Sequence, residues 1–97
     1  MKIIIAQLVE FENDPFPHIW QKEFESNLIP VVGMCVEDSL WKDPDTYKIV
    51  EVTVNYTENY YYVVVDRFEP TIPEKIRNEI EKAAISHGWK LPWKNNS

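Results

Sequence analysis

The chain has 97 residues, of which 44% are hydrophobic and 13% aromatic. That composition is too apolar for a disordered chain, and the length suits one domain with one modest core. The 16 acidic and 10 basic residues give a formal net charge of −6 with no basic cluster, so direct nucleic-acid binding is disfavoured. We expect a single domain over residues 1–97, with residues 89–97 as an aromatic C-terminal tail.

Residues 2–12 predict the first strand, with Ile3 and Ile5 on its apolar side. The run Ile3-Ile4-Ile5 is apolar on both faces, which indicates a central or covered strand. Residues 13–15 (Asn-Asp-Pro) end it. The short apolar start lacks a cleavage site and runs into acids, so we expect no signal peptide, no membrane span and a cytoplasmic protein.

Residues 16–28 fit two patterns. Trp20, Phe24 and Leu28 recur every four residues, as on a helix face, whereas Trp20, Lys22 and Phe24 alternate as in a strand. The preceding Asn-Asp-Pro is a plausible hairpin loop, so we favour a second strand that pairs with the first.

A corner at Pro30 and a short strand follow within residues 29–34, with a bend at Gly33. Cys35, the only cysteine, excludes an internal disulfide. It lies in the apolar run 31–36, which predicts a buried thiol. Residues 37–45 form a polar loop that carries Trp41.

Residues 47–66 predict a β-hairpin, with its turn at residues 57–59. A two-residue loop, Glu58-Asn59, pairs Tyr56 with Tyr61 and places the valines of both strands on one face. We expect the same pairing from a four-residue loop, whereas a three-residue loop changes it and is the second alternative. The valine register makes Glu51 and Asp66 direct cross-strand neighbours. Like charges opposite each other destabilise a ladder, so a basic side chain, solvation, a shared proton or a bound cation should offset the pair.

The C-terminal part predicts a helix. Residues 71–74 (Thr-Ile-Pro-Glu) match a capping box, and Gly88 suits the helix end. An apolar stripe follows the helical period through Ile72, Ile76, Ile80, Ala83, Ala84 and His87. In the tail, Trp89, Leu91 and Trp93 alternate, and the tryptophans serve either the core or an interface.

Together these elements predict an α+β fold. We expect a twisted antiparallel sheet of four or five strands, with closure into a partly open small barrel as an option, and one C-terminal helix packed on it.

Motifs for catalysis, phosphate binding and dinucleotide binding are missing from the sequence. His18, Cys35 and His87 are far apart, without the paired spacing of a zinc site. We therefore predict no catalytic residue, no metal and no cofactor. The acids Glu37, Asp38, Asp43, Asp45, Glu51 and Asp66 can cluster near the open end of the hairpin, either as a solvated rim or as an acid pair.

Aromatic residues beside acids are typical of protein-binding surfaces. We expect a non-enzymatic small acidic protein-binding module, such as an inhibitor, immunity or accessory protein of bacterial or phage origin. Its predicted interface is Trp41, Glu51, Asn55, Tyr60, Tyr62 and Asp66. Self-association through an exposed strand edge is a variant. The alternatives are a small-ligand binder or hydrolase-like enzyme that uses clustered carboxylates, and a nucleic-acid mimic with acids along one ridge.

Overall fold

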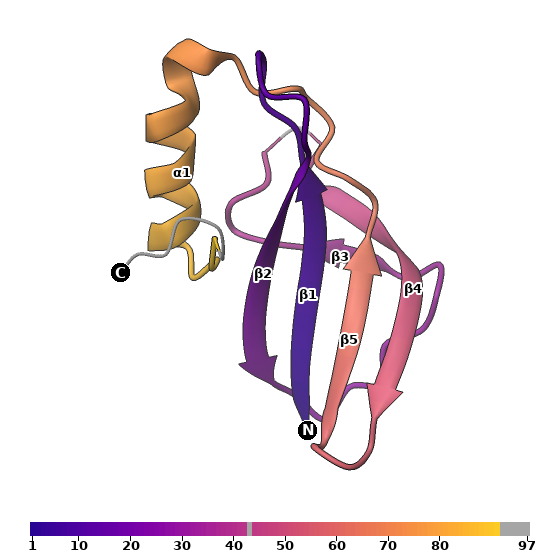
Figure 1. Ribbon diagram of the computed structural model, residues 1–97. Coiled ribbons are helices and arrows are strands. Elements are labelled where there is room, and N and C mark those ends of the chain that lie inside the picture. Colours follow the sequence, from indigo (N-terminus) through magenta and orange to yellow (C-terminus); the bar gives the residue numbers. More distant parts are fainter. Residues whose placement is uncertain (43, 92–97) are drawn as a thin grey trace.

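The computed structural model describes residues 1–42 and 44–91, which form a five-stranded sheet and one C-terminal helix (Figure 1). The strands are β1 (Lys2–Val9), β2 (His18–Glu25), β3 (Cys35–Glu37), β4 (Thr46–Asn55) and β5 (Tyr60–Val65). A 3₁₀ turn, Glu74–Ile76, leads into the helix α1 (Arg77–Ser86). The sheet has the order β2-β1-β5-β4-β3 and curls into a half-barrel, which confirms the predicted α+β fold.

The strand β1 lies inside the sheet, because it pairs with β2 on one side and with β5 on the other. Its pairing with β5 is parallel, whereas every other pair is antiparallel, so the sheet is mixed rather than purely antiparallel. The central position explains the run of three isoleucines. Ile3 and Ile5 are buried on the concave inner face, and Ile4 is half-buried on the convex outer face.

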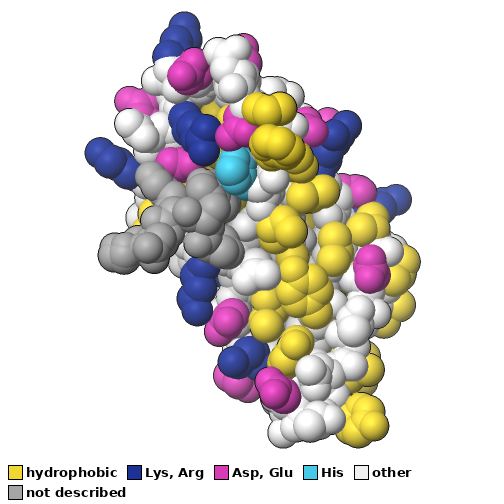
Figure 2. Space-filling view, in the orientation of Figure 1, with side chains coloured by type: hydrophobic (Ala, Val, Ile, Leu, Met, Phe, Trp, Pro, Cys, Tyr) yellow, Lys and Arg dark blue, Asp and Glu magenta, His cyan; other side chains and the backbone are white. Residues whose placement is uncertain are grey.

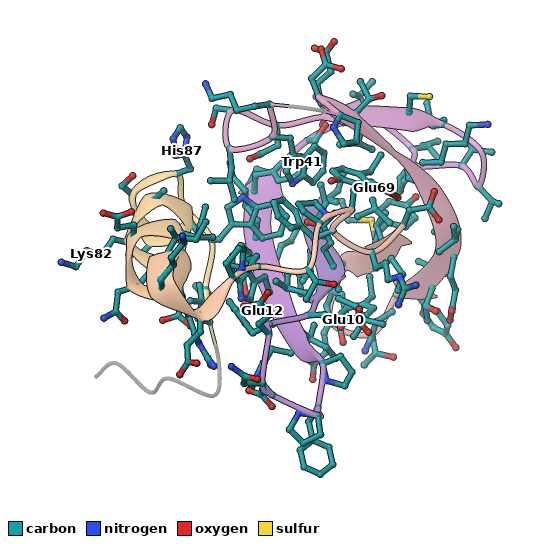
Figure 3. All side chains as sticks on the ribbon, turned by 90° about the horizontal axis from the view of Figure 1, so that it is seen from above. Glu10, Glu12, Trp41, Glu69, Lys82 and His87 are labelled. Carbon is teal, nitrogen blue, oxygen red and sulfur yellow. The ribbon has the colours of Figure 1, made fainter. Side chains whose placement is uncertain are left out.

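The core fills the concave side of the curled sheet (Figure 3). Strand residues of the inner face supply much of it, and residues from the loops, the helix and the tail complete it. Its buried members are Ile3, Ile5, Val9, Phe11, Trp20, Trp41, Tyr47, Ile49, Val63, Val65, Ile72, Ala84, Trp89 and Leu91.

The segment that fits both a helix and a strand forms the strand β2, as favoured from the sequence. Asn13 has a φ of 64°, in the left-handed region that asparagine tolerates, so the chain turns sharply before β2. Gln7 of β1 pairs with Trp20, which places Trp20 on the inner face, where it is fully buried. Alternation, rather than the four-residue spacing, therefore describes this segment.

The β4–β5 hairpin forms, but its pairing differs from the prediction. Asn55 pairs with Tyr60, so the loop has four residues, 56–59, which is the four-residue alternative, and the expected pairing of Tyr56 with Tyr61 is wrong. The pairing is displaced by two residues, which leaves each side chain on its expected face. Val52 pairs with Val63 on the inner face, so the predicted sharing of one face by the valines is confirmed.

The displaced pairing also separates the two acids that were expected to face each other. Glu51 pairs with Val64, in the same register as Asn55 with Tyr60, so Glu51 is not the direct neighbour of Asp66 and that prediction is wrong. The next residue, Val50, is an extra residue in the ladder, and beyond it Ile49 pairs with Val65. The Asp66 amide donates instead to the Lys48 carbonyl, at 2.9 Å.

The predicted capping box does not form. The 3₁₀ turn begins after Pro73 without a side-chain cap, and Thr71 is exposed. The reason is that Ile72 is held in an extended bridge beside Phe11. Its amide donates to the Glu10 carbonyl, and its carbonyl accepts from the Glu12 amide, both at 2.9 Å.

The helix buries Ala84, while Ile76 and Ile80 pack against the core. Gly88 follows with a φ of 94° and reverses the chain, so that Trp89 folds back into the core. This is the core alternative expected for that tryptophan; Trp93 lies outside the described residues. Within the described part of the chain, no helix is long and apolar enough to cross a membrane.

Two expectations for the segment before β4 are wrong. The strand β3 starts at Cys35 instead of lying within residues 29–34, because Gly33 turns the chain with a φ of 97°. Cys35 is exposed rather than buried. It belongs to a three-residue strand next to β4, where only one neighbouring strand covers it.

Candidate protein-binding surface

The convex outer face of the sheet is free of the helix and of the loops that fill the concave side (Figure 1). In the view of Figure 2, hydrophobic side chains form a band along these strands. The residues at its centre, which come from β1, β2 and β5, are Ile4, Leu8, Ile19, Tyr62 and Val64. Leu8 and Ile19 are 40% and 44% exposed. A contiguous exposed apolar surface of this kind is typical of an interaction site.

Tyr62 lies between the apolar centre and the polar flank of the outer face. Its hydroxyl accepts a hydrogen bond from Gln21 Nε2 at 3.1 Å, so the contact reaches from β5 to β2. Ala6, in β1, pairs with Gln21 and is buried. A small side chain in the strand between them leaves room for the contact, which fixes the position of the tyrosine ring.

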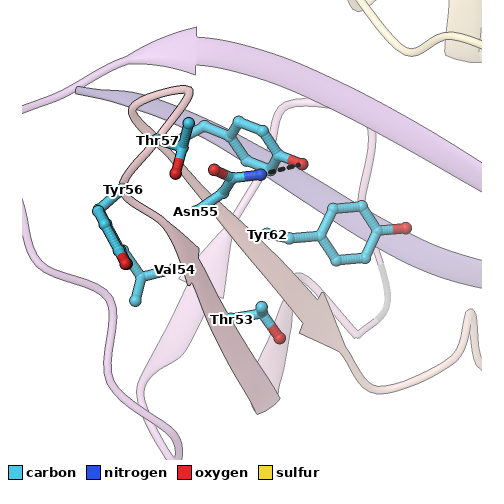
Figure 4. Close-up of a pocket in the computed structure, with 7 residues that line it drawn as sticks. Thr53, Val54, Asn55, Tyr56, Thr57 and Tyr62 are labelled. Atoms are coloured by element: carbon cyan, nitrogen blue, oxygen red, sulfur yellow. Dashed lines mark hydrogen bonds between the residues drawn. The ribbon is translucent and has the colours of Figure 1, made fainter.

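The outer face continues into a hollow at the β4–β5 turn (Figure 4). Its volume is about 330 Å³. Asn55 Nδ2 donates to the Tyr60 hydroxyl at 3.4 Å, and Asn55 Oδ1 accepts from the Glu58 amide at 3.0 Å. The turn is therefore fixed by a side chain of the hollow itself. The lining residues are Thr53, Val54, Asn55, Tyr56, Thr57, Tyr60 and Tyr62.

The structure brings four of the six predicted interface residues together on the outer face of β4 and β5. Cross-strand pairing places Asn55 beside Tyr60 and Thr53 beside Tyr62, with Glu51 further along the same face. The amide of Asn55 and both tyrosine rings line the same hollow.

Trp41 is separated from the other predicted interface residues. It is only 3% exposed, and its ring packs edge-on against Tyr47 with 4.7 Å between ring centroids. Its indole N–H donates to Gln7 Oε1 at 3.2 Å. The polar loop therefore supplies this tryptophan to the core rather than to the outer face.

Glu51 and Asp66 are exposed and do not form an acid pair. Val64 lies opposite Glu51, whereas Asp66 lines a different hollow together with Lys48 and Glu69. Within residues 1–42 and 44–91, neither carboxylate has an ion-pair partner. Glu51 thus places a negative charge on the β4–β5 side of the outer face, whereas Asp66 belongs to the separate hollow.

Asp38, another acid of the predicted cluster, has a structural role. Its carboxylate accepts hydrogen bonds from Lys22 Nζ at 2.6 Å, from the Leu40 amide at 3.0 Å and from Trp89 Nε1 at 3.0 Å. Burial by itself raises the pKa of Asp38, but the hydrogen bonds, first that of Lys22, outweigh it and hold the pKa below the usual value. Asp38 therefore connects the loop between β3 and β4 with β2 and with the segment that folds back after the helix. Asp43 lies outside the described residues.

A second polar cluster joins the β1–β2 turn to the helix. His18 Nε2 lies 2.8 Å from Asp14 Oδ2, and this hydrogen bond is the first cause that lowers the pKa of Asp14. Arg77 bridges Asp14, at 3.3 Å, and Glu81, at 3.1 Å, and its guanidinium lies over the Phe11 ring at 4.0 Å. The charges are paired across three elements, as in a structural ion-pair network.

The structure also places Ser39 Oγ 2.7 Å from His87 Nδ1. The contact is exposed and His87 is the C-cap residue of α1 (Figure 3). A nucleophile–base pair needs a third group that orients the base, and the described residues offer His87 none. Among these residues, three or more histidine, cysteine or acidic side chains do not gather where they could hold a metal ion.

Sequence reasoning missed the contribution of β1 and β2 to the outer face. The run Ile3-Ile4-Ile5 was the available signal, because it indicates apolar side chains on both faces. Placing Ile4, Leu8 and Ile19 beside Tyr62 also required the parallel pairing of β1 with β5, which has no local signal.

Comparison of the chain with protein families, curated proteins and solved structures finds no match. The outer face is therefore interpreted from its own geometry and chemistry.

Proposed function

We propose that the chain is a non-enzymatic protein-binding module that uses the outer face of its sheet. The observation that carries this proposal is the apolar centre of that face, where Leu8 and Ile19 are 40% and 44% exposed beside Tyr62 and none of the described loops covers them. An inhibitor, immunity or accessory protein of bacterial or phage origin fits this size and charge. Such proteins act by occupying a surface of their target.

The composition of the face supports protein binding rather than ligand binding. Tyrosine rings bury a large area at low entropic cost, and their hydroxyls can hydrogen-bond across an interface. Tyr62 is already held by Gln21, so little freedom is lost when a partner binds. A broad convex face also suits a macromolecule better than a small molecule, which is usually enclosed in a concave site.

The charge beside the apolar centre indicates the chemistry of the partner. Glu51 is exposed on the outer face, and the chain carries a net charge of −6. A partner with an apolar centre flanked by lysine or arginine complements this arrangement. The charges mainly accelerate association, so binding should weaken as salt is added.

The test is recovery of a partner from a lysate of the cells that produce the chain. We expect the parent protein to retain a partner that the double variant Leu8→Ser, Ile19→Ser loses by tenfold or more. Both side chains are partly exposed, so the substitutions should leave the fold intact. Bound proteins are identified by mass spectrometry, and the fold is checked by circular dichroism.

Val32→Ser is the matched control, because Val32 is also exposed but lies in the loop before β3, away from the outer face. This variant should retain the partner. The proposal is wrong if the parent protein recovers no partner, or if the double variant recovers as much of it as Val32→Ser does.

The two hollows described above give the enzymatic alternative no support, since Asp66 lines one of them and Glu51 lines neither. Nucleic-acid mimicry stays a prediction. It requires that a nucleic-acid-binding protein be the recovered partner and that substitution of the acids, rather than of Leu8 and Ile19, abolish the complex.

A further inference from the structure

The second half of β4 is a free strand edge. On the side of β4 away from β5, residues 46–48 pair with β3. The Ile49 carbonyl accepts a hydrogen bond from the Gly33 amide at 2.8 Å, and the Ile49 amide donates to the Met34 carbonyl at 2.9 Å. Beyond Ile49, the described residues supply no strand on that side (Figure 1).

The free edge presents unpaired backbone groups. Along a strand, the N–H and C=O of successive residues point to alternate sides. The bulge turns both Val50 and Glu51 toward β5, so the next residue that faces away is Val52, followed by Val54. Two amides and two carbonyls therefore point outward, and Val54 is 51% exposed.

Beyond the bulge at Val50 and the charge of Glu51, the edge lacks the usual protection against strand pairing. Natural sheets cover an edge, or place lysine or proline on it. Residues 51–55 here read Glu-Val-Thr-Val-Asn, with no lysine, no proline and high strand propensity. The segment that should cover it, β3, ends its pairing at Lys48.

We infer that β4 of one copy pairs antiparallel with β4 of a second copy, about a two-fold axis through Thr53. In this register Val52 of each copy pairs with Val54 of the other. Each of these two pairs exchanges two N–H···O bonds, so the dimer gains four backbone hydrogen bonds. Glu51 then faces Asn55 rather than another carboxylate. Thr53 faces its own equivalent, and such threonine pairs stabilise a sheet.

Other symmetric registers are less complementary. With an axis through Val52, Val52 pairs with its equivalent and Val54 faces Val50, which lies in the bulge. With an axis through Val54, Val54 pairs with its equivalent and Val52 faces Tyr56, which lies in the turn. The chosen register also separates the two Glu51 side chains by about four residues, or roughly 13 Å, more than the screening length in physiological salt. A second copy therefore fits this edge in charge and in hydrogen bonding. This inference does not depend on the proposed function, whose apolar centre lies on β1, β2 and β5.

The first test is the molar mass in solution, measured by light scattering over a wide range of concentrations. The parent protein should reach twice the mass of one chain. Val54→Pro removes an outward N–H in each copy without removing a bond to β5, and should weaken the dimer by about tenfold or more. Val54→Ala keeps the N–H and should still dimerise. A parent protein that stays monomeric, or a Val54→Pro dimer as strong as that of Val54→Ala, overturns the inference.

The second test determines which residues of the two β4 strands lie opposite each other. It does not require that the proline variant folds. Thr53→Cys in a Cys35→Ser background places two thiols at a non-hydrogen-bonded pair, within the distance that a disulfide spans. Mild oxidation should give a covalent dimer. Val54→Cys in the same background is the control, because its equivalent lies one diagonal step away and should not cross-link. Equal cross-linking of the two variants, or none in either, contradicts the proposed pairing.

Discussion

At the scale of single residues, Asp38 shows how one acid can join distant parts of a small domain. Its carboxylate receives three hydrogen bonds, and the donors belong to β2, to its own loop and to the tail after the helix. Lys22 also lies 5.9 Å from the centre of the Trp89 ring, so the same cation contacts both. Sequence alone marked Asp38 only as one acid of a cluster.

This carboxylate predicts a pH dependence of stability. The pKa of Asp38 is lower in the folded chain than its ordinary value of 3.8, so its stabilising contribution is complete above that value and is lost as the pH falls through the folded pKa. Between about pH 5 and pH 2, the free energy of unfolding should therefore fall more steeply in the parent protein than in Asp38→Asn.

Urea unfolding at a series of pH values measures this difference. Asp14, whose pKa is also lowered, is present in both proteins, so the difference between the curves belongs to Asp38. Parallel curves for the two proteins would show that the carboxylate is not held in its charged form by the fold.

At the scale of secondary-structure elements, the helix is attached by a charge as well as by its apolar stripe. Arg77, the first residue of α1, contacts Asp14 in the β1–β2 turn, Glu81 one turn along the helix and the Phe11 ring. Glu81 is only 3% exposed. The helix therefore carries a buried carboxylate that Arg77 contacts at the point where the helix meets the sheet.

Arg77→Leu should destabilise the fold by roughly 3 kcal/mol, because it removes the arginine from a buried acid. Lys75→Leu, at an exposed position two residues earlier, should change the stability by no more than about 0.5 kcal/mol. Denaturant unfolding followed by circular dichroism compares the two. If the double variant Arg77→Leu, Glu81→Gln is no more stable than Arg77→Leu alone, the loss does not come from the contact between Arg77 and the Glu81 carboxylate.

At the scale of the whole molecule, the three described tryptophans share one core. Trp20, Trp41 and Trp89 come from β2, a loop and the tail, and all are buried in the same cluster. We therefore expect a single cooperative unit over the whole chain. Thermal unfolding followed by tryptophan fluorescence and by far-ultraviolet circular dichroism should coincide, with an enthalpy near roughly 70 kcal/mol for a chain of this length. Two separate transitions would contradict the single-domain prediction.

The sequence predicted what depends on near neighbours. Alternation identified β2 and the faces of β4 and β5, and glycine marked the end of the helix. Predictions failed where a distant segment or the length of a turn decided the local pairing. The extended bridge between Phe11 and Ile72 prevents the capping box, and the pairing set by the four-residue β4–β5 loop places Val64, not Asp66, opposite Glu51. Four of the predicted interface residues share a face although the pairing of β4 with β5 is displaced by two residues. Side chains alternate between faces with a period of two, so a displacement of two residues keeps each side chain on its face.

The parallel pairing of β1 with β5 has a consequence for synthesis on the ribosome. The first strand leaves the exit tunnel early, yet its second neighbour is encoded roughly 50 residues later. At ordinary translation speeds that interval lasts on the order of 3–10 s, during which the isoleucine-rich segment has only the nascent β1–β2 hairpin to protect it. Chaperones that bind short aliphatic segments would meet this chain at that stage, and truncation before residue 60 would leave the segment permanently open to them.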